Sequence, residues 1–221
     1  MARMARVVIP NYPHHITQRG NRRQKTFFCA DDYCYYIDLM SEFSHQSGTE
    51  IWAYCLMPNH VHLVMVPREE EGLRTTLGEV HRRYTRYINF REGWRGHLWQ
   101  ERFHSFIMDE KYLMSTVRYV ERNPVVARLC DKPDDWVWSS ARAHLDGVDD
   151  KLVRVKPMLD RVDNWRAYLK GNDENDYVEL IDKHTRTGRP LGSVDFVHKL
   201  EAISGKDLAL KRPGRKPVNV K

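Results

Sequence analysis

The stretch EIWAYCLMPNHVHLVMV, residues 50–66, predicts two β-strands joined by a tight turn. Apolar and polar residues alternate along 50–57, and a second, largely apolar run follows at 60–66. Pro58 and Asn59 lie between the two runs and are typical turn residues. We therefore expect a β-hairpin, and the elements on either side of it decide the fold.

The hairpin has one predicted strand and one predicted helix on each side. Before it, residues 14–20 predict a strand that ends in a glycine turn, and residues 31–48 predict a helix. After it, residues 72–90 carry an apolar helical stripe, and residues 102–108 predict a fourth strand. The order β-α-β-β-α-β indicates an α+β protein with a ferredoxin-like fold, in which two helices cover one face of an antiparallel sheet.

The remainder of the chain is less regular. Asp109 is expected to cap a further helix from about Glu110, which is free to lie over the open face of the sheet. Residues 136–145 predict a short closing helix, whereas residues 150–190 are polar and broken by Pro, Gly and Asn. A compact amphipathic helix is predicted over 193–204.

These patterns divide the chain into three parts. Residues 1–148 form the main domain, residues 149–205 form a C-terminal extension with short helices, and residues 206–221 have the composition of a disordered basic tail. Ser193 and Gly205 are the expected N-cap and C-terminal residue of the helix in the extension.

The formal net charge is +6, and nearly all of the excess positive charge lies in the last sixteen residues. Basic surface elsewhere must come from local clusters, which fit a polyphosphate partner such as a nucleic acid. The alternative is ordinary solvated arginine. The candidate DNA-binding residues are Arg19, Arg22, Arg23, Lys25, Arg82, Arg83, Arg86, Arg95 and Arg102.

Composition argues against several classes of protein. No apolar run approaches the length of a membrane span, and the basic start MARMAR is not followed by the apolar stretch of a signal peptide. We therefore expect a cytoplasmic protein with no membrane partner. Its four cysteines form no CxxC pair, which argues against a disulfide scaffold or a zinc knuckle.

The second strand of the hairpin carries His60 and His62 on one face, because side chains alternate along a strand. Val61 and Leu63 then point to the other face, where the helices pack. Two neutral imidazoles on one face can hold a divalent ion and leave positions open for a phosphate. The alternative is a pair of histidines that face solvent or satisfy hydrogen bonds in the core.

The helix expected after Glu110 supplies further candidates. Its apolar stripe leaves Tyr119 and Asn123 on a polar side, one turn apart. If that side faces the histidines, the Asn123 amide oxygen completes a metal site and the Tyr119 hydroxyl lies beside the bound phosphate. Tyrosine can attack a phosphodiester and keep the bond energy in a phosphotyrosine, so that a strand can be rejoined.

Other roles for these residues stay open from the sequence. Asn123 precedes Pro124 and is typical of an N-cap for a new helix, and Tyr119 is also typical of an amphipathic surface tyrosine. Tyr84 and Tyr87 are rival nucleophiles, although their positions on an apolar stripe favour packing.

Two further alternatives concern the metal and the loop around residues 94–99. His60, His62 and His104 would suit zinc in a metallohydrolase, in which a metal-activated water leaves no protein–DNA bond. Trp94 and Trp99 offer surfaces on which unpaired bases can stack, and the alternative for Trp99 is packing in the core.

Three segments together carry a family resemblance: YCLMPNHVHLVMVP, LWQERFHSFIMD and YLMSTVRYVERNPVVARL. In this combination the chain resembles the single-tyrosine HUH transposases, and within them the REP-associated tyrosine transposases of bacteria. The resemblance covers roughly residues 10–145. One departure is Asn123, because the insertion-sequence branch usually has Gln there, and the shorter side chain puts direct metal ligation in doubt.

The resemblance implies a specific activity. Single-stranded DNA with a hairpin from a repetitive extragenic palindrome (REP) would be the substrate, and Tyr119 would attack a phosphate next to the hairpin. The products would be a 5′-phosphotyrosine and a free 3′-hydroxyl, with Mg²⁺ or Mn²⁺ held by His60, His62 and Asn123. The protein would be nucleoid-associated and act as a monomer or homodimer. The alternative is a domesticated protein that binds DNA hairpins with weak or absent chemistry.

Overall fold

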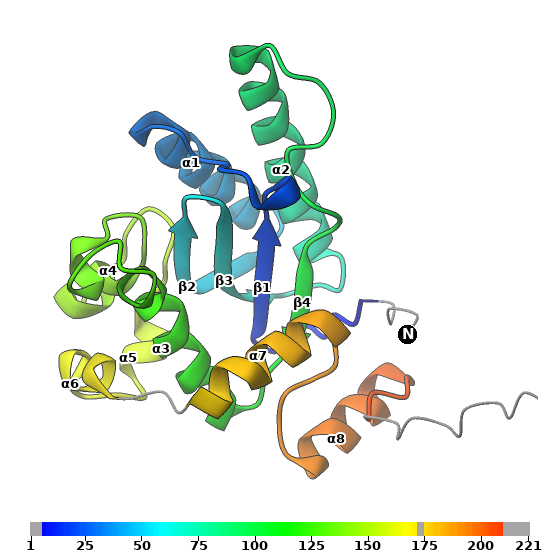
Figure 1. The fold of residues 1–221 in the computed structure, drawn as a ribbon. Helices are drawn as coiled ribbons and strands as arrows, with labels where there is room; N and C mark the ends of the chain where they lie inside the picture. Colours follow the sequence, from blue (N-terminus) through cyan, green and yellow to red (C-terminus); the bar gives the residue numbers. More distant parts are fainter. Residues whose placement is uncertain (1–5, 172–174, 210–221) are drawn as a thin grey trace, which may run out of the picture.

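A computed structural model describes residues 6–171 and 175–209, and Figure 1 shows its fold. Four strands and two long helices form the first half of the chain, and shorter helices follow. The elements are β1 (His14–Arg19), the 3-10 helix η1 (Asn21–Arg23), α1 (Ala30–Gln46), β2 (Thr49–Met57), β3 (His60–Pro67), α2 (Gly72–Glu92), β4 (His104–Ile107), α3 (Glu110–Val126), the 3-10 helix η2 (Pro133–Asp135), α4 (Ala141–Asp146), α5 (Lys156–Leu159), α6 (Trp165–Lys170), α7 (Asn175–Thr187) and α8 (Val194–Ser204).

The four strands form one antiparallel sheet in the order β2-β3-β1-β4. The predicted hairpin turns at Pro58 and Asn59, between β2 and β3. This order and the β-α-β-β-α-β sequence of elements confirm the predicted ferredoxin-like fold. In the register of the sheet, His62 lies opposite Thr17 of β1, and Thr17 lies opposite His104 of β4.

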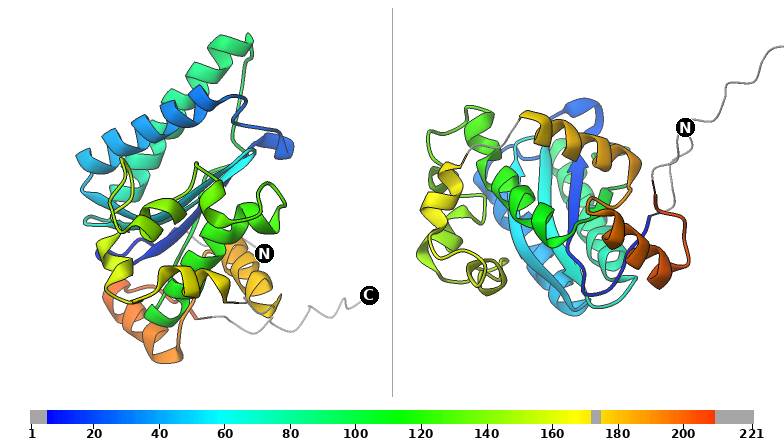
Figure 2. Two further views of the ribbon diagram at one scale, coloured as in Figure 1. Left: turned by 90° about the vertical axis from the view of Figure 1, so that its left-hand side faces the viewer. Right: turned by 90° about the horizontal axis from the view of Figure 1, so that it is seen from below.

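One face of the sheet packs against α1 and α2, as the left view of Figure 2 shows. Ile16, Val61 and Leu63 point to this side and are fully buried. Asp32 of α1 is also buried and forms an ion pair with Arg91 of α2, which joins the two helices. The predicted alternation of side chains along β3 is therefore confirmed.

The opposite face is covered by α3 and by parts of the C-terminal extension (Figures 1 and 2). Val64 of β3 and Phe106 of β4 pack there against Leu113 and Val117 of α3. Asp109 caps α3 as predicted, because its side chain accepts a hydrogen bond from the backbone N–H of Tyr112.

Helix α3 differs from one alternative that the sequence left open, and it also carries a buried carboxylate. The helix runs through Pro124 to Val126, so the interpretation of Asn123 as the N-cap of a new helix is wrong. Pro124 has no backbone N–H, so α3 lacks the hydrogen bond to the Val120 carbonyl in its last turn, and the packing of the helix on the sheet outweighs this loss. Glu121, two residues beyond Tyr119, is fully buried and accepts hydrogen bonds from three side chains, namely Ser140, His144 and Trp165.

The C-terminal extension contains more regular structure than its polar composition suggested. Helix α7 forms over residues that the sequence analysis interpreted as broken, and Ile181 and His184 on it are buried. Helix α8 begins after the Ser193 cap and ends at Gly205, as predicted. Leu208 is buried against α8, and the rest of the predicted tail, 210–221, lies outside the described residues.

Three smaller points can also be compared with the structure. All four cysteines are free thiols, as expected. Trp99 is buried and contacts the rings of Tyr84 and His81, so it packs in the core. Among the described helices, none is long and apolar enough to cross a membrane.

Candidate active site

The candidate site lies on the face of the sheet that α3 covers. Strand β3 directs His60 and His62 towards this face, and β1 directs His15 and Thr17 to the same side. The imidazole rings of His60 and His62 lie 4.9 Å apart between centroids and are nearly perpendicular. Both rings border the same space in front of the sheet.

Helix α3 brings Tyr119 to the two histidines. Its ring centroid lies 5.4 Å from that of His62, with the two planes at 88°. The phenol is half-buried, and Asn123, one turn further along α3, forms a side-chain hydrogen bond with it. The structure thus brings together Tyr119, His60, His62 and Asn123 within one chain, although they come from elements far apart in the sequence.

Hydrogen bonds hold both histidine rings in place. The Nδ1 atom of His60 lies 2.7 Å from the side-chain oxygen of Asn59, and the Nδ1 atom of His62 lies 3.1 Å from Nε2 of His15. In each ring the Nε2 atom is therefore the one that remains to bind a ligand. Sequence reasoning did not single out His15, although its position on β1, two residues before Thr17, places it on the same face.

The site keeps its histidines neutral. Burial lowers the pKa of His60 to about 4, with a further contribution from the positive charge of Arg19. Burial also lowers the pKa of His62 well below its usual value, and the neighbouring His60, His15 and Arg19 act in the same direction. Neutral imidazole is the protonation state in which histidine binds metal ions, so both rings are in that state near pH 7.

The phenol of Tyr119 is protonated at neutral pH. Burial raises its pKa, and the negative charge of Asp182 on α7 raises it further. The hydrogen bond from Asn123 and the positive charge of Arg19 oppose this rise. The phenol is thus influenced by two opposite charges, those of Asp182 and Arg19.

These side chains line a cleft of about 500 Å³. One wall is formed by α7, a part of the site that the sequence analysis missed. Tyr177 anchors this helix through hydrogen bonds to Thr116 and to the backbone oxygen of Tyr112. The available signal was the helical spacing of Tyr177, Ile181 and His184, which the surrounding polar residues obscured. The α7 residues in the wall are Ile181, Asp182, Thr185 and Arg186.

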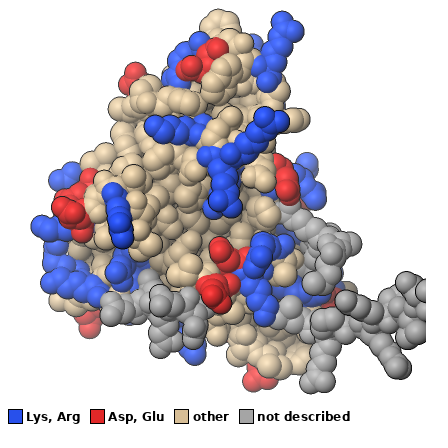
Figure 3. Space-filling view, in the orientation of Figure 1, with Lys and Arg blue, Asp and Glu red and all other residues tan. Residues whose placement is uncertain are grey.

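Two of the predicted DNA-binding residues, Arg19 and Arg23, line the cleft. Both are exposed and lie where β1 ends and η1 follows. Figure 3 shows Lys and Arg side chains gathered on this part of the molecule, and acidic and basic side chains together over α7. The rim above the histidines is therefore positively charged.

The other predicted DNA-binding residues lie outside the cleft. Arg82 and Arg83 on α2 form ion pairs with Glu79, and Arg82 and Arg102 line a separate hollow of about 460 Å³. Arg22, Lys25, Arg86 and Arg95 are exposed on the surface.

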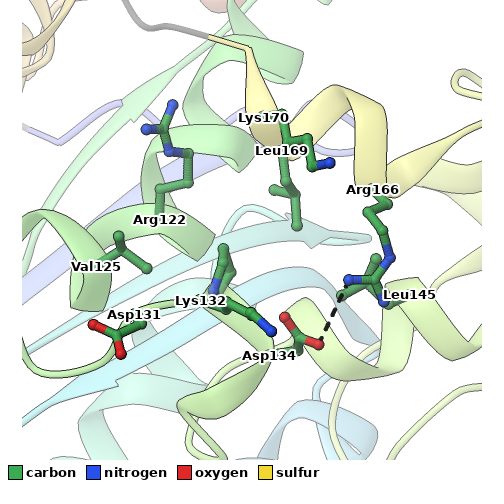
Figure 4. A pocket seen from close by; sticks show the side chains of 10 residues that line it. Arg122, Val125, Asp131, Lys132, Asp134, Leu145, Arg166, Leu169 and Lys170 are labelled. Atoms are coloured by element: carbon green, nitrogen blue, oxygen red, sulfur yellow. Dashed lines mark ion pairs between the residues drawn. The ribbon is translucent and has the colours of Figure 1, made fainter.

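A further hollow of about 510 Å³ lies on the other flank of α3, against α4 and α6 (Figure 4). Arg122 and Val125 of α3 line it, together with Arg166 of α6, which forms an ion pair with Asp134. It contains none of the predicted catalytic or metal-binding residues and is separate from the cleft.

The described residues hold no group of three His, Cys, Asp or Glu side chains that would bind a metal ion. In particular, His62 and His104 lie two strands apart, which corresponds to roughly 10 Å across a sheet. The Nδ1 atom of His104 instead lies 2.9 Å from the backbone oxygen of Thr185. The zinc site of the metallohydrolase hypothesis is therefore not found among the described residues.

Comparisons with known proteins agree with this fold. A family model described as an IS200-like transposase matches residues 9–123, more than half of the chain. The protein therefore belongs to the IS200-like transposase family, which confirms the resemblance noted in its sequence.

Two individual proteins are similar to this chain. A Haemophilus influenzae protein that carries the provisional name REP-associated tyrosine transposase is 28% identical over 102 residues, which span 41% of this chain and 58% of that protein. The solved structure of a REP-associated tyrosine transposase bound to a REP hairpin superposes with a TM-score of 0.58 at 20% identity, covering 68% of this chain and 90% of the other. The first match spans little more than half of its relative, and the second supports the fold.

Proposed function

We propose that this protein is a metal-dependent transposase that nicks and rejoins single-stranded DNA beside REP-like hairpins. The observation that carries the proposal is the position of Tyr119, whose ring lies edge-on to His62 at 5.4 Å inside a positively rimmed cleft. A tyrosine and two neutral imidazoles in one cleft match the needs of covalent phosphoryl transfer. Membership of a transposase family supports the same reaction class.

The residues present fit a divalent cation. His60 and His62 each have an Nε2 atom left after their Nδ1 hydrogen bonds, and Asn123 can add an amide oxygen while its NH2 group donates to Tyr119. This mixture of nitrogen and oxygen ligands suits Mn²⁺ or Mg²⁺. When bound, the ion would supply positive charge that polarises the phosphate to be attacked.

Tyr119 carries the chemistry in this proposal. Its oxygen attacks the phosphorus atom, and the bond between phosphorus and the 3′ oxygen breaks, which gives a 5′-phosphotyrosine and a free 3′-hydroxyl. The phenol loses one proton, and the departing 3′ oxygen gains one. Because the new ester keeps the energy of the phosphodiester, the reverse attack by a 3′-hydroxyl rejoins a strand.

Arg19 and Arg23 provide the contacts with DNA nearest to this chemistry. Both line the cleft beside the histidines, where their guanidinium groups can bind backbone phosphates. The hairpin is suggested by the similar solved structure, which holds a REP hairpin. Since the nucleophile and the histidines belong to one chain, a monomer has all of these groups.

A second candidate function is binding of DNA hairpins without strand cleavage. Asp182 favours it, because this carboxylate lies near the phenol and places negative charge where a phosphate would have to approach. In that case Arg19 and Arg23 would still bind DNA, and Tyr119 would be dispensable.

A covalent-adduct assay separates the two functions. The protein is incubated with a labelled single strand that carries a REP-like hairpin and Mn²⁺, and the products are separated on a denaturing gel. We expect a labelled protein band with the wild type and with Tyr112→Phe, a matched control on the same helix, and none with Tyr119→Phe. An equal band from Tyr119→Phe, or no band from the wild type, would exclude the transposase chemistry.

A further inference from the structure

His15 is the least expected member of the site. It is fully buried on β1, the strand next to that of His62, and the two rings are stacked with centroids 5.3 Å apart and planes within 11°. The edges of Phe106 and Tyr119 close the pocket around it, at 5.0 and 6.4 Å between centroids. Its strand position leaves it no route to solvent, so His15 can act on a substrate only through its neighbours.

The bond between the two rings has two forms. The Nε2 atom of His15 and the Nδ1 atom of His62 lie 3.1 Å apart, and one proton lies between them. If His15 donates, the second proton of His62 sits on its Nε2 atom and blocks that atom as a ligand. If His62 donates, its Nε2 atom presents a lone pair to the cleft.

The remaining nitrogen of His15 favours, in the absence of a cation, the form in which His15 donates. Its Nδ1 atom is buried and has no hydrogen-bond partner. When His62 donates, this atom carries a proton without an acceptor, which is unfavourable. When His15 donates, the atom keeps an unpaired lone pair, which is better tolerated. A cation at the Nε2 atom of His62 would shift the pair towards the first of these forms.

We infer that His15 is a positioning residue that accepts the Nδ1 hydrogen of His62 and thereby makes the Nε2 atom of His62 available to the divalent cation. This inference rests on the metal-dependent function proposed above. Ligand histidines in metal sites commonly donate their second N–H to a carboxylate, a backbone carbonyl or water. Here a second, buried imidazole takes the place of those acceptors.

Metal binding tests the inference without the need for catalysis. Binding of Mn²⁺ to the full chain is followed by the electron paramagnetic resonance signal of the free ion. We expect His15→Phe, which keeps a stacked ring but cannot accept a hydrogen bond, to weaken Mn²⁺ binding by about 10- to 100-fold. His15→Gln, whose amide oxygen can accept, should restore most of the affinity.

The outcomes distinguish this inference from the proposed function. Wild-type protein that binds no Mn²⁺ would overturn the proposed metal site itself. If the wild type binds Mn²⁺, and a folded His15→Phe variant binds it equally tightly, only the role of His15 would be overturned. Binding of single-stranded DNA in the absence of metal should be the same in all three proteins.

A spectroscopic measurement on the wild type covers the case in which His15→Phe does not fold. Nitrogen-15 spectra of the histidine side chains at saturating Mg²⁺ report which nitrogen of His62 carries the proton. We expect the proton on Nδ1 of His62. A proton on Nε2 of His62 under these conditions would overturn the inference.

Discussion

Removal of the Glu121 carboxylate should strongly destabilise the protein. This side chain is fully buried in α3 and accepts hydrogen bonds from Ser140, from His144 at 2.6 Å and from Trp165 at 2.9 Å. It joins α3, the helix that carries Tyr119, to α4 and α6. In Glu121→Ala, three buried donors lose their common acceptor.

The size of the effect follows from these contacts. A buried donor without a partner costs about 1–3 kcal/mol. Because the three donors share one acceptor, the costs are not additive, and we expect Glu121→Ala to lower the free energy of unfolding by about 4 kcal/mol. For a chain of this size that corresponds to a fall in Tm of about 8–16 °C.

Urea denaturation at pH 7, followed by tryptophan fluorescence, measures this change. Glu42→Ala is the matched control, because Glu42 is exposed on α1, and it should change the free energy of unfolding by less than about 0.5 kcal/mol. A loss below about 1 kcal/mol in Glu121→Ala would refute the view that this carboxylate holds α3 in place.

Three further predictions concern charge and pH. Asp182→Asn removes a negative charge that raises the pKa of the cleft tyrosine, so the pH profile of adduct formation should move to lower pH, by less than about one pH unit. Arg19→Gln combined with Arg23→Gln should weaken binding of single-stranded DNA and reduce the magnitude of the slope of log affinity against log salt by about one to two. The control Arg83→Gln, which removes an ion pair on α2, should leave this slope unchanged. Burial lowers the pKa of His14 to about 4, so below pH 6.5 the unfolded chain takes up a proton that the folded chain does not. The free energy of unfolding should therefore fall by roughly 2 kcal/mol from pH 7 to pH 5 through this residue alone. Calorimetry of His14→Gln should show a shallower fall over the same pH range.

The hairpin illustrates how much of the fold can be predicted from the sequence. Alternation along β3 separates His60 and His62 from Val61 and Leu63, and the structure buries the apolar pair against α1 and α2. Because the period of a strand is two residues, such a pattern admits only one orientation of the strand when one face is buried. The turn at Pro58 then places β2 beside β3.

Helix α3 shows where local signals mislead. The sequence Asn123–Pro124 is typical of a helix start, yet α3 continues through it to Val126. The buried stripe of Leu113, Val117 and Val120 packs on the sheet and outweighs the local preference. The position of the helix, and hence of Tyr119, depends on that tertiary packing.

Two parts of the site could not be predicted from the sequence. The contact of His15 with His62 depends on the register of β1 against β3, which no local pattern encodes. Asp182 reaches Tyr119 only because α7 packs beside β4, across a long separation in the chain. His15 and Asp182 thus act on His62 and Tyr119, two residues that the sequence did identify.

The identity of the residue that becomes linked to DNA tests the central claim most directly. After reaction with a hairpin-bearing single strand and Mn²⁺, nuclease and protease digestion leave a short nucleotide on one peptide, which tandem mass spectrometry can locate. We predict the nucleotide on Tyr119, in the α3 peptide. A nucleotide on Tyr84, Tyr87 or any other residue would contradict the account.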